Sequence, residues 1–409
     1  MAELRTNGDR LWQSLAEMAK LGATPAGGNK RLALSDEDKA GRELFVSWAR
    51  EAGCEISIDS MGNIFARRPG TQAEAEPVMS GSHLDTQPTG GRFDGVYGVL
   101  AALEVLRSLN DGDVQTARPV EAVVWTNEEG SRFQPAMMGS GVFAGVLDQD
   151  RVYATVDQDG KSVGDELERI GYKGALPAQA RPIHAYLEAH IEQGPVLEEE
   201  GRTIGVVTGI QGMKWLKATV RGMNAHAGTT PMEVRRDPLL GAARMVDAID
   251  RTTRALRPDA VATVGEFSVG PGSINVINQE VRFSIDIRCP DEPVLEEQKK
   301  RVLAACGEIS GDMGLELDIE EIWHVPPTVF HGNIVDAVEE AASALGLPGK
   351  RMISGAGHDA KYLAEICPTG MIFIPCKDGI SHNETEDILQ EHATAGADVL
   401  LHTVLRLAG

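Results

Sequence analysis

The chain has 409 residues and a formal net charge of −22, from 39 Lys and Arg against 61 Asp and Glu. It is too long for one ordinary core, so we expect two domains or one large domain with an insertion. The acidity disfavours binding to nucleic acid or to anionic membranes, because both would repel it. No stretch approaches the roughly 20 apolar residues of a membrane span.

The first half of the chain alternates between strand and helix patterns. Apolar residues at helical spacing predict a helix over residues 8–21, and Ser35 with an acidic first turn opens a second helix. A polar loop, residues 81–95, joins a buried strand to a helix from Val96 to Leu109. Such alternation predicts a mixed, mainly parallel sheet covered by helices. The expected strands are Glu55–Asp59, Asn63–Arg67, Pro77–Ser80, Val120–Thr126 and a strand that ends within Leu187–Gly194.

From residue 212 to residue 327 the pattern changes to an α+β unit of four strands and two long helices. This is the composition of a ferredoxin-like sandwich, inserted into the first domain. Alternation resumes afterwards with a strand at Gly370–Ile374 and a last helix after Glu386. We therefore expect an α/β catalytic domain of residues 1–211 and 328–409, with an inserted domain of residues 212–327. The inserted elements are strands Lys214–Val220, Ala260–Ser268, Glu280–Arg288 and Glu316–Ile322, and helices Asp237–Leu256 and Asp291–Ser310.

Two features of the 81–95 loop can be interpreted either as ordinary structural features or as parts of a functional site. His83 and Asp85 form a His-x-Asp pair, and a carboxylate often accepts the second N–H of a metal-bound imidazole. An isolated pair of this kind is more often ordinary surface. Asp94 precedes Gly95 and the next helix, so it is either a helix cap or a carboxylate that bridges two metal ions.

Three further segments carry candidate ligands in or after expected strands. Glu128 and Glu129 come after an apolar strand, where adjacent carboxylates repel unless a cation or a shared proton compensates. A solvated acidic turn is the alternative. His190 lies within an apolar strand and His382 lies in a polar turn, and each alone is explained as a core or a surface histidine.

Together, His, Asp, Glu, His and His at five strand ends or loops of one α/β domain indicate a metal site. Nitrogen and oxygen ligands without thiolates suit Zn²⁺, Mn²⁺, Co²⁺ or Ni²⁺. Five scattered cysteines without a CxxC pair argue against a thiolate site and favour reduced thiols. With no apolar core of a signal peptide at the N-terminus, we expect a cytoplasmic protein.

The motifs resemble those of the N-carbamoyl-L-amino-acid hydrolases, a group that includes β-ureidopropionase and allantoate amidohydrolase. This group lies within the aminoacylase/carboxypeptidase superfamily of dinuclear metallohydrolases. The resemblance runs through the whole chain, insertion included. The matching segments, in order, are Gly-Ser-His83-Leu-Asp85-Thr, Gly-Gly-Arg-Phe-Asp94-Gly, Asn-Glu128-Glu129-Gly-Ser-Arg-Phe, His190-Ile-Glu-Gln193-Gly-Pro and Ser-His382-Asn-Glu.

The resemblance implies two divalent metal ions, Zn²⁺ first among the candidates. One ion is held by His83, Asp94 and His190. The other is held by Asp94, Glu129 and His382, so that Asp94 bridges both.

Further roles follow from the same resemblance. Glu128 is the general base, and Asp85 orients His83. His226, in Arg221-Gly-Met-Asn-Ala-His226-Ala-Gly, matches a histidine that reaches the active site of the partner subunit. The inserted domain is thus a dimerisation and lid domain, and the protein is a homodimer whose active site is completed in trans.

The implied substrate-binding residues are Gln193, His226, Asn275 and Arg288. Gln193 matches the family's ligand of the ureido group, and Asn275 a substrate-binding asparagine. Arg288 matches the residue that binds the substrate carboxylate, and a guanidinium can do so through two parallel hydrogen bonds. A solvated charge at a strand end is the alternative for Arg288.

The function implied is hydrolysis of an N-carbamoyl amino acid to amino acid, CO₂ and ammonia, a reaction on a linear amide that is not a peptide bond. The nearest alternative is allantoate amidohydrolase. An aminoacylase or dipeptidase is disfavoured, because the peptidase branches usually carry a carboxylate where this chain has His190. A non-catalytic binding homologue is the third alternative, and Glu128 argues against it because binding alone needs no free base.

Overall fold

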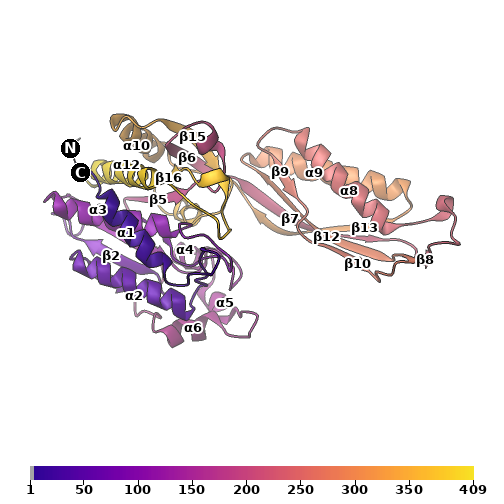
Figure 1. The fold of residues 1–409 in the computed structure, drawn as a ribbon, viewed down its shortest axis with the longest axis horizontal. Coiled ribbons are helices and arrows are strands. Elements are labelled where there is room, and N and C mark those ends of the chain that lie inside the picture. The colour runs from indigo at the N-terminus through magenta and orange to yellow at the C-terminus, as the bar shows by residue number, and fades with distance from the viewer. Residues whose placement is uncertain (1–3) are drawn as a thin grey trace. The chain divides into compact units, whose positions relative to one another are not determined.

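A computed structural model describes residues 4–409 (Figure 1). The chain divides into two compact units. Unit 1 consists of the residues up to Thr208 together with Val329–Gly409, and unit 2 consists of Gly209–Thr328. Among the described residues, no helix combines the length and the apolar character needed to cross a membrane.

Unit 1 is built on a nine-stranded mixed sheet with strand order β1-β2-β4-β3-β5-β16-β6-β14, and β15 pairs with β6. The strands are β1 (Glu55–Ile58), β2 (Ile64–Arg68), β3 (Val78–His83), β4 (Val120–Trp125), β5 (Ala185–Ile191), β6 (Ile204–Ile210), β14 (Thr328–Val329), β15 (Gly349–Ser354) and β16 (Thr369–Ile374).

The four central strands β4, β3, β5 and β16 are parallel to one another, whereas β2 and β6 run antiparallel on either side of them. Every residue of the four central strands is buried, as expected for a parallel sheet covered on both faces. Because these strands are parallel, their carboxyl ends meet at one edge of the sheet, where open α/β folds bind ligands.

Helices cover this sheet. α3 is apolar around most of its circumference and nearly all of it is buried, which fits a helix packed between the sheet and other helices. The predicted cap of α2 is confirmed, because Ser35 Oγ accepts from the Asp38 N–H. The helices are α1 (Gly8–Ala19), α2 (Asp36–Glu51), α3 (Val96–Asp111), α4 (Met138–Phe143), α5 (Gln149–Ala154), α6 (Val163–Ile170), α7 (Val196–Glu199), α10 (Gly332–Ala344), α11 (Ala360–Leu363) and α12 (Gln390–Ala408).

Unit 2 has a five-stranded antiparallel sheet, order β10-β12-β7-β13 with β9 beside β12. Alternate residues of β7 and β12 point into a core shared with α8 and α9, and Figure 1 shows both helices on the same side of the sheet. A short ribbon of β8 and β11 accompanies it. The elements are β7 (Gly212–Arg221), β8 (Ala225–His226), α8 (Pro238–Arg254), β9 (Val261–Thr263), β10 (Phe267–Gly270), β11 (Val276–Ile277), β12 (Glu280–Cys289), α9 (Glu292–Asp312) and β13 (Glu316–Val325).

Some elements differ from the sequence prediction. The single strand expected at Ala260–Ser268 is wrong, since β9 and β10 are separate strands with Gly265 between them. The pattern did not indicate β6, in which two glycines weaken the strand signal. It also did not indicate α4, α5 and α6, which are too short to develop a clear helical period.

Candidate metal centre

The candidate site lies at the carboxyl edge of the parallel strands. His83 is the last residue of β3, and His190 is the last but one of β5. Glu128 and Glu129 follow β4 after a two-residue turn, and His382 lies in the loop that follows β16. Parallel pairing of β3 with β4 and of β5 with β16 therefore brings four separate segments of the chain to one place.

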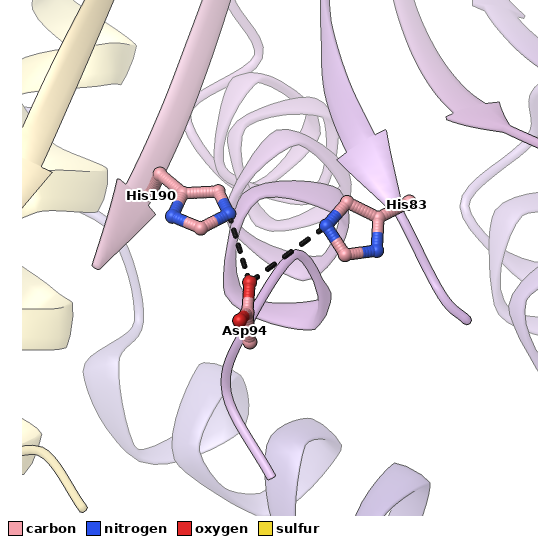
Figure 2. A group of neighbouring side chains, drawn as sticks. All are labelled: His83, Asp94 and His190. Atoms are coloured by element: carbon pink, nitrogen blue, oxygen red, sulfur yellow. Dashed lines mark ion pairs between the residues drawn. The ribbon is translucent and has the colours of Figure 1, made fainter. Parts of the chain in front are cut away.

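Asp94 lies between two histidines on one side of the site. Its Oδ1 is 3.2 Å from His190 Nε2 and 3.8 Å from His83 Nε2. All three side chains are buried, and Figure 2 shows both imidazoles turned toward the carboxylate from two neighbouring strands. One atom from each residue lies within 4.8 Å of the others, close enough for one metal ion.

The other oxygen of Asp94 belongs to a second group. His382 Nε2 is 3.2 Å from Asp94 Oδ2 and 3.3 Å from Glu129 Oε2, and these three residues also meet the spacing of a metal site. Asp94 is thus shared by both groups with a different oxygen in each. The loop that ends at Asp94 also requires Gly95, since a Cβ there would overlap the His83 ring and its φ is +67°.

The two buried imidazoles are oriented by backbone carbonyls. His83 Nδ1 donates to the carbonyl of Asp85 at 2.9 Å, and His190 Nδ1 donates to the carbonyl of Ile191 at 2.9 Å. A carbonyl can only accept, so the proton sits on Nδ1 in each ring. Nε2 is left to face Asp94, which is the arrangement of a metal-ligating histidine.

Asp85 contributes two contacts with different parts of the residue. Its carbonyl orients His83, while its carboxylate lies farther from that ring, at 3.9 Å from Nδ1. The carboxylate oxygens accept instead from the N–H groups of Glu128 and Glu129, each at 3.2 Å. Burial raises the pKa of Asp85 to about 6. Asp85 therefore ties the β3 loop to the acidic turn after β4.

Glu128 and Glu129 differ in their partners. Glu129 accepts from Gln87 Nε2 at 2.7 Å and faces His382. Glu128 is buried, with Oε2 at 3.4 Å from His83 Nε2. Burial, together with the surrounding carboxylates, raises the pKa of Glu128 well above its usual value. Glu128 belongs to neither of the two three-residue groups.

The electrostatics of the site call for added positive charge. Burial lowers the pKa of His190, but the hydrogen bond and charge of Asp94 outweigh it and raise the pKa to about 9. Hydrogen bonds to Asp94 and Glu129 raise the pKa of His382 to about 11. In the protein alone, protons on these rings balance the carboxylates. Divalent cations would replace those protons, and a set of imidazole and carboxylate donors suits Zn²⁺ or a similar ion.

The other predicted site residues divide between the units. Gln193 is in unit 1, where its Nε2 donates to Asp94 Oδ2 at 2.8 Å and its buried Oε1 has no hydrogen-bond partner in the protein. In unit 2, His226 ends β8 and Asn275 comes directly before β11, and both are exposed. Arg288, near the end of β12, pairs through Nε and Nη2 with Asp286.

His226 has a defined tautomer. Its Nδ1 accepts from the N–H groups of Gly228 and Thr229 at 3.0 and 3.1 Å. The neutral ring therefore carries its proton on Nε2, which makes that atom a hydrogen-bond donor.

Several residues that contact the centre were not predicted. Gln87 binds Glu129, while Ser381 and Glu386 lie next to Asp94. They sit in polar loops, where no hydrophobic period distinguishes one side chain from another. The buried ring of His358 packs edge-on against His190, with centroids 4.5 Å apart. The sequence Gly355-Ala-Gly-His358-Asp is the signal that could have drawn attention to this ring.

Comparison with known proteins agrees with this geometry. Residues 79–406 match the model of peptidase family M20/M25/M40. The chain is 50% identical to an N-carbamoyl-L-amino-acid amidohydrolase of Rhizobium meliloti over 99% of this chain and 97% of that protein. It is 34% identical to an allantoate amidohydrolase of Bacillus subtilis, over 96% and 95% of the two chains.

A solved structure is also similar throughout. It is an amidase of the hydantoinase/carbamoylase family from Burkholderia multivorans, 55% identical, with a TM-score of 0.96 and coverage of 99% of this chain and 98% of that one. The predicted resemblance is therefore confirmed. The chain belongs to peptidase family M20/M25/M40, a family of metallohydrolases, and its close homologues are N-carbamoyl-L-amino-acid amidohydrolases, hydrolases of C–N bonds other than peptide bonds.

Proposed function

We propose that this protein hydrolyses N-carbamoyl-L-amino acids to the amino acid, CO₂ and ammonia. The observation that carries the proposal is the shared carboxylate of Asp94, with His190 at one oxygen and His382 at the other, beside a Glu128 that joins neither group. The relative that is 50% identical over nearly the whole of both chains supports the ureido acid as substrate.

We propose two divalent ions in this centre, with Zn²⁺ as the first candidate and Mn²⁺, Co²⁺ or Ni²⁺ as alternatives. His83, Asp94 and His190 would hold one ion, and Asp94, Glu129 and His382 the other. Such ions, when bound, lower the pKa of a water molecule and polarise the carbonyl of the substrate.

Glu128 would take the proton of the attacking water and deliver it to the departing nitrogen. Its neighbour Asp85 fixes the backbone on which it stands, through the N–H groups of Glu128 and Glu129. Deep burial keeps bulk water away from the carboxylate, so the proton it accepts is not lost to solvent before the C–N bond breaks.

The proposed substrate-binding residues are the four that the sequence predicted. The unpartnered Oε1 of Gln193 is suited to accept an N–H of the ureido group. Arg288 would bind the carboxylate of the substrate through paired charge-assisted hydrogen bonds, with Asn275 as a further polar contact. The Nε2–H of His226 would donate to the oxyanion of the tetrahedral intermediate.

We further propose that unit 2 is a dimerisation and lid domain, and that His226 serves the active site of a second copy of the chain. The exposed position of His226 on its ribbon is consistent with a role outside its own unit. The five buried, unpaired cysteines suit the reducing cytoplasm, which is the proposed location.

The test is an ammonia-release assay on protein of measured metal content. The substrates are N-carbamoyl-L-amino acids, N-carbamoyl-β-alanine, allantoate and an N-acetyl amino acid. We expect ammonia from N-carbamoyl-L-amino acids, its loss after treatment with a chelator, and its return when Zn²⁺ or Mn²⁺ is added. Ammonia mainly from allantoate would assign the activity of the allantoate relative instead. Metal-loaded protein that releases ammonia from none of these substrates would overturn the proposal.

A further inference from the structure

We propose that Glu386 is a positioning residue that fastens the loop carrying Asp94 to the loop carrying His382, and so sets the geometry of the second metal-binding group. The inference rests on the proposed function, because it assumes that Asp94 and His382 hold an ion. None of the sequence motifs described above includes Glu386.

The contacts of Glu386 join segments nearly 300 residues apart. Oε1 accepts from the N–H groups of Phe93 and Asp94 at 3.0 and 3.1 Å. Oε2 accepts from Ser381 Oγ at 2.8 Å. The side chain is 1% exposed, so water does not compete for these bonds. One carboxylate therefore holds the backbone of Asp94 and the residue next to His382.

Ser381 carries this link to the side chain of Asp94. Its hydroxyl lies between Glu386 Oε2 and Asp94 Oδ2, at 2.8 and 3.1 Å. Asp94 Oδ2 is also the oxygen that faces His382. The spacing of the two loops thus bears directly on the oxygen proposed to bind the second ion.

The 81–95 loop has room for Glu386 only because of a glycine. A Cβ at Gly91 would overlap the carboxyl group of Glu386. Gly91 does not have a positive φ, so its backbone is open to other residues and the lack of a side chain serves the fit of Glu386. The loop is shaped around this contact.

The burial of Glu386 beside Asp94 carries a cost in free energy. A buried carboxylate that touches the backbone of another buried carboxylate costs free energy through desolvation and repulsion. Divalent ions at Asp94 would offset the repulsion, so the cost is compensated in the metal-loaded protein.

The experiment compares Glu386→Ala and Glu386→Gln with Glu104→Ala. Glu104 is a matched control, because it is equally buried and accepts from the Asn7 N–H at 3.0 Å and from Ser108 Oγ at 3.1 Å. It lies in α3, away from the centre. Metal-free proteins are titrated with Zn²⁺ in competition with a coloured chelator. The rise in melting temperature caused by Zn²⁺ is measured in parallel.

We expect Glu386→Ala to weaken Zn²⁺ binding by about 10- to 100-fold, the usual effect of removing a residue that supports a metal ligand. Glu386→Gln should stay within about threefold of the unmutated protein, because its Oε1 can accept from both backbone N–H groups and its Nε2 can donate to Ser381 Oγ. Glu104→Ala should lower the melting temperature and leave Zn²⁺ affinity unchanged. A Gly91→Ala variant should reproduce the loss, whereas Gly332→Ala, at a position with open space, should not.

The outcomes separate this inference from the proposed function. Unmutated Zn²⁺ affinity in Glu386→Ala, or an equal loss in Glu104→Ala, would overturn the positioning role alone. A Gln variant as weak as the Ala variant would show that the charge, and not the bonding, matters, and would also reject the role. An unmutated protein that binds no divalent ion would overturn the metal centre together with this inference.

Discussion

The two units hold their candidate site residues in opposite ways. In unit 1, His83, Asp94 and His190 are buried and held by hydrogen bonds, the two histidines to nearby backbone carbonyls and Asp94 to Gln193. In unit 2, His226 at the end of β8 and Asn275 directly before β11 are exposed. Arg288 is partly exposed and its side chain pairs with Asp286 two residues away on the same strand.

This difference matches two proposed functions, which are metal binding with proton transfer in unit 1 and substrate recognition in unit 2. Groups that hold ions and move a proton must be fixed before the substrate arrives, because small displacements there reduce the rate strongly. Groups that recognise a substrate can remain exposed to solvent until a ligand or a partner subunit covers them. The comparison predicts that variants in unit 1 alter metal binding or proton transfer, whereas variants in unit 2 alter turnover or substrate affinity and leave the metals in place.

The largest expected effect is in unit 1, where the adjacent residues Glu128 and Glu129 should respond differently to the same substitution. Glu128→Gln should keep its metal content and lose turnover by about 10²- to 10⁴-fold, the contribution of a general base. Glu129→Gln should instead release metal, because Glu129 faces His382 at 3.3 Å. Metal analysis and kcat measured on the same preparations distinguish the two. Near-normal turnover in Glu128→Gln would remove it from the base role.

In unit 2 the largest effect is expected at His226. His226→Ala should lower kcat by about 10²- to 10³-fold, as when one oxyanion donor is removed, with unchanged metal affinity. If the active site is completed in trans, as proposed, mixing this variant with Asp94→Ala should restore part of the activity, because each hybrid dimer would contain one complete site. Activity that stays absent in the hybrids, with mixed dimers demonstrated by mass, would argue against a site shared between subunits.

A smaller effect is expected at Arg288. Arg288→Lys keeps the charge and loses the paired geometry, so KM should rise about 10- to 100-fold, equivalent to one lost charge-assisted hydrogen bond. Arg282→Lys is the control, since Arg282 is exposed on the same strand and pairs with Glu280. The difference between the two variants should vanish for a substrate whose carboxylate is replaced by an amide. An equal rise in KM in both variants would reject the assignment.

The sequence was informative about unit 1 where a side chain ends an apolar run. His83 ends the buried strand β3, and the Glu128–Glu129 pair follows the buried strand β4. Parallel pairing gathers such ends at one edge without any detail of side-chain packing. The alternation of strands and helices therefore predicted the mixed α/β sheet as well as the meeting of its candidate ligands. Asp94 could be recognised as a candidate ligand only together with the other motifs, because an Asp-Gly pair before a helix is also a common helix cap.

Other features depend on contacts that no local pattern encodes. Glu386 and Ser381 lie in a polar loop, and only the folded chain brings them to Phe93 and Asp94. The carbonyl of Asp85, rather than its carboxylate, meets His83 Nδ1, which is a matter of loop conformation. Strand β6 was not predicted, because its two glycines reduce the hydrophobic signal of the sequence. Pairing with a neighbouring strand still stabilises it.

The smallest expected effect is a change of stability with pH, which should differ between metal-free and metal-loaded protein. The pKa of His190 is raised to about 9 in the folded chain, above its unfolded value of about 6.5. In metal-free protein this group therefore adds stability that is fully present below pH 6.5 and is lost as pH rises toward 9. Divalent ions need the neutral imidazole, so their affinity should increase over the same range. The gain in melting temperature on adding Zn²⁺ should thus grow from pH 6 to pH 8.5, measured by calorimetry at fixed free Zn²⁺, because the metal-free protein weakens while the loaded protein strengthens. A gain that stays constant with pH would show that the imidazoles of unit 1 are not the groups that exchange protons for metal.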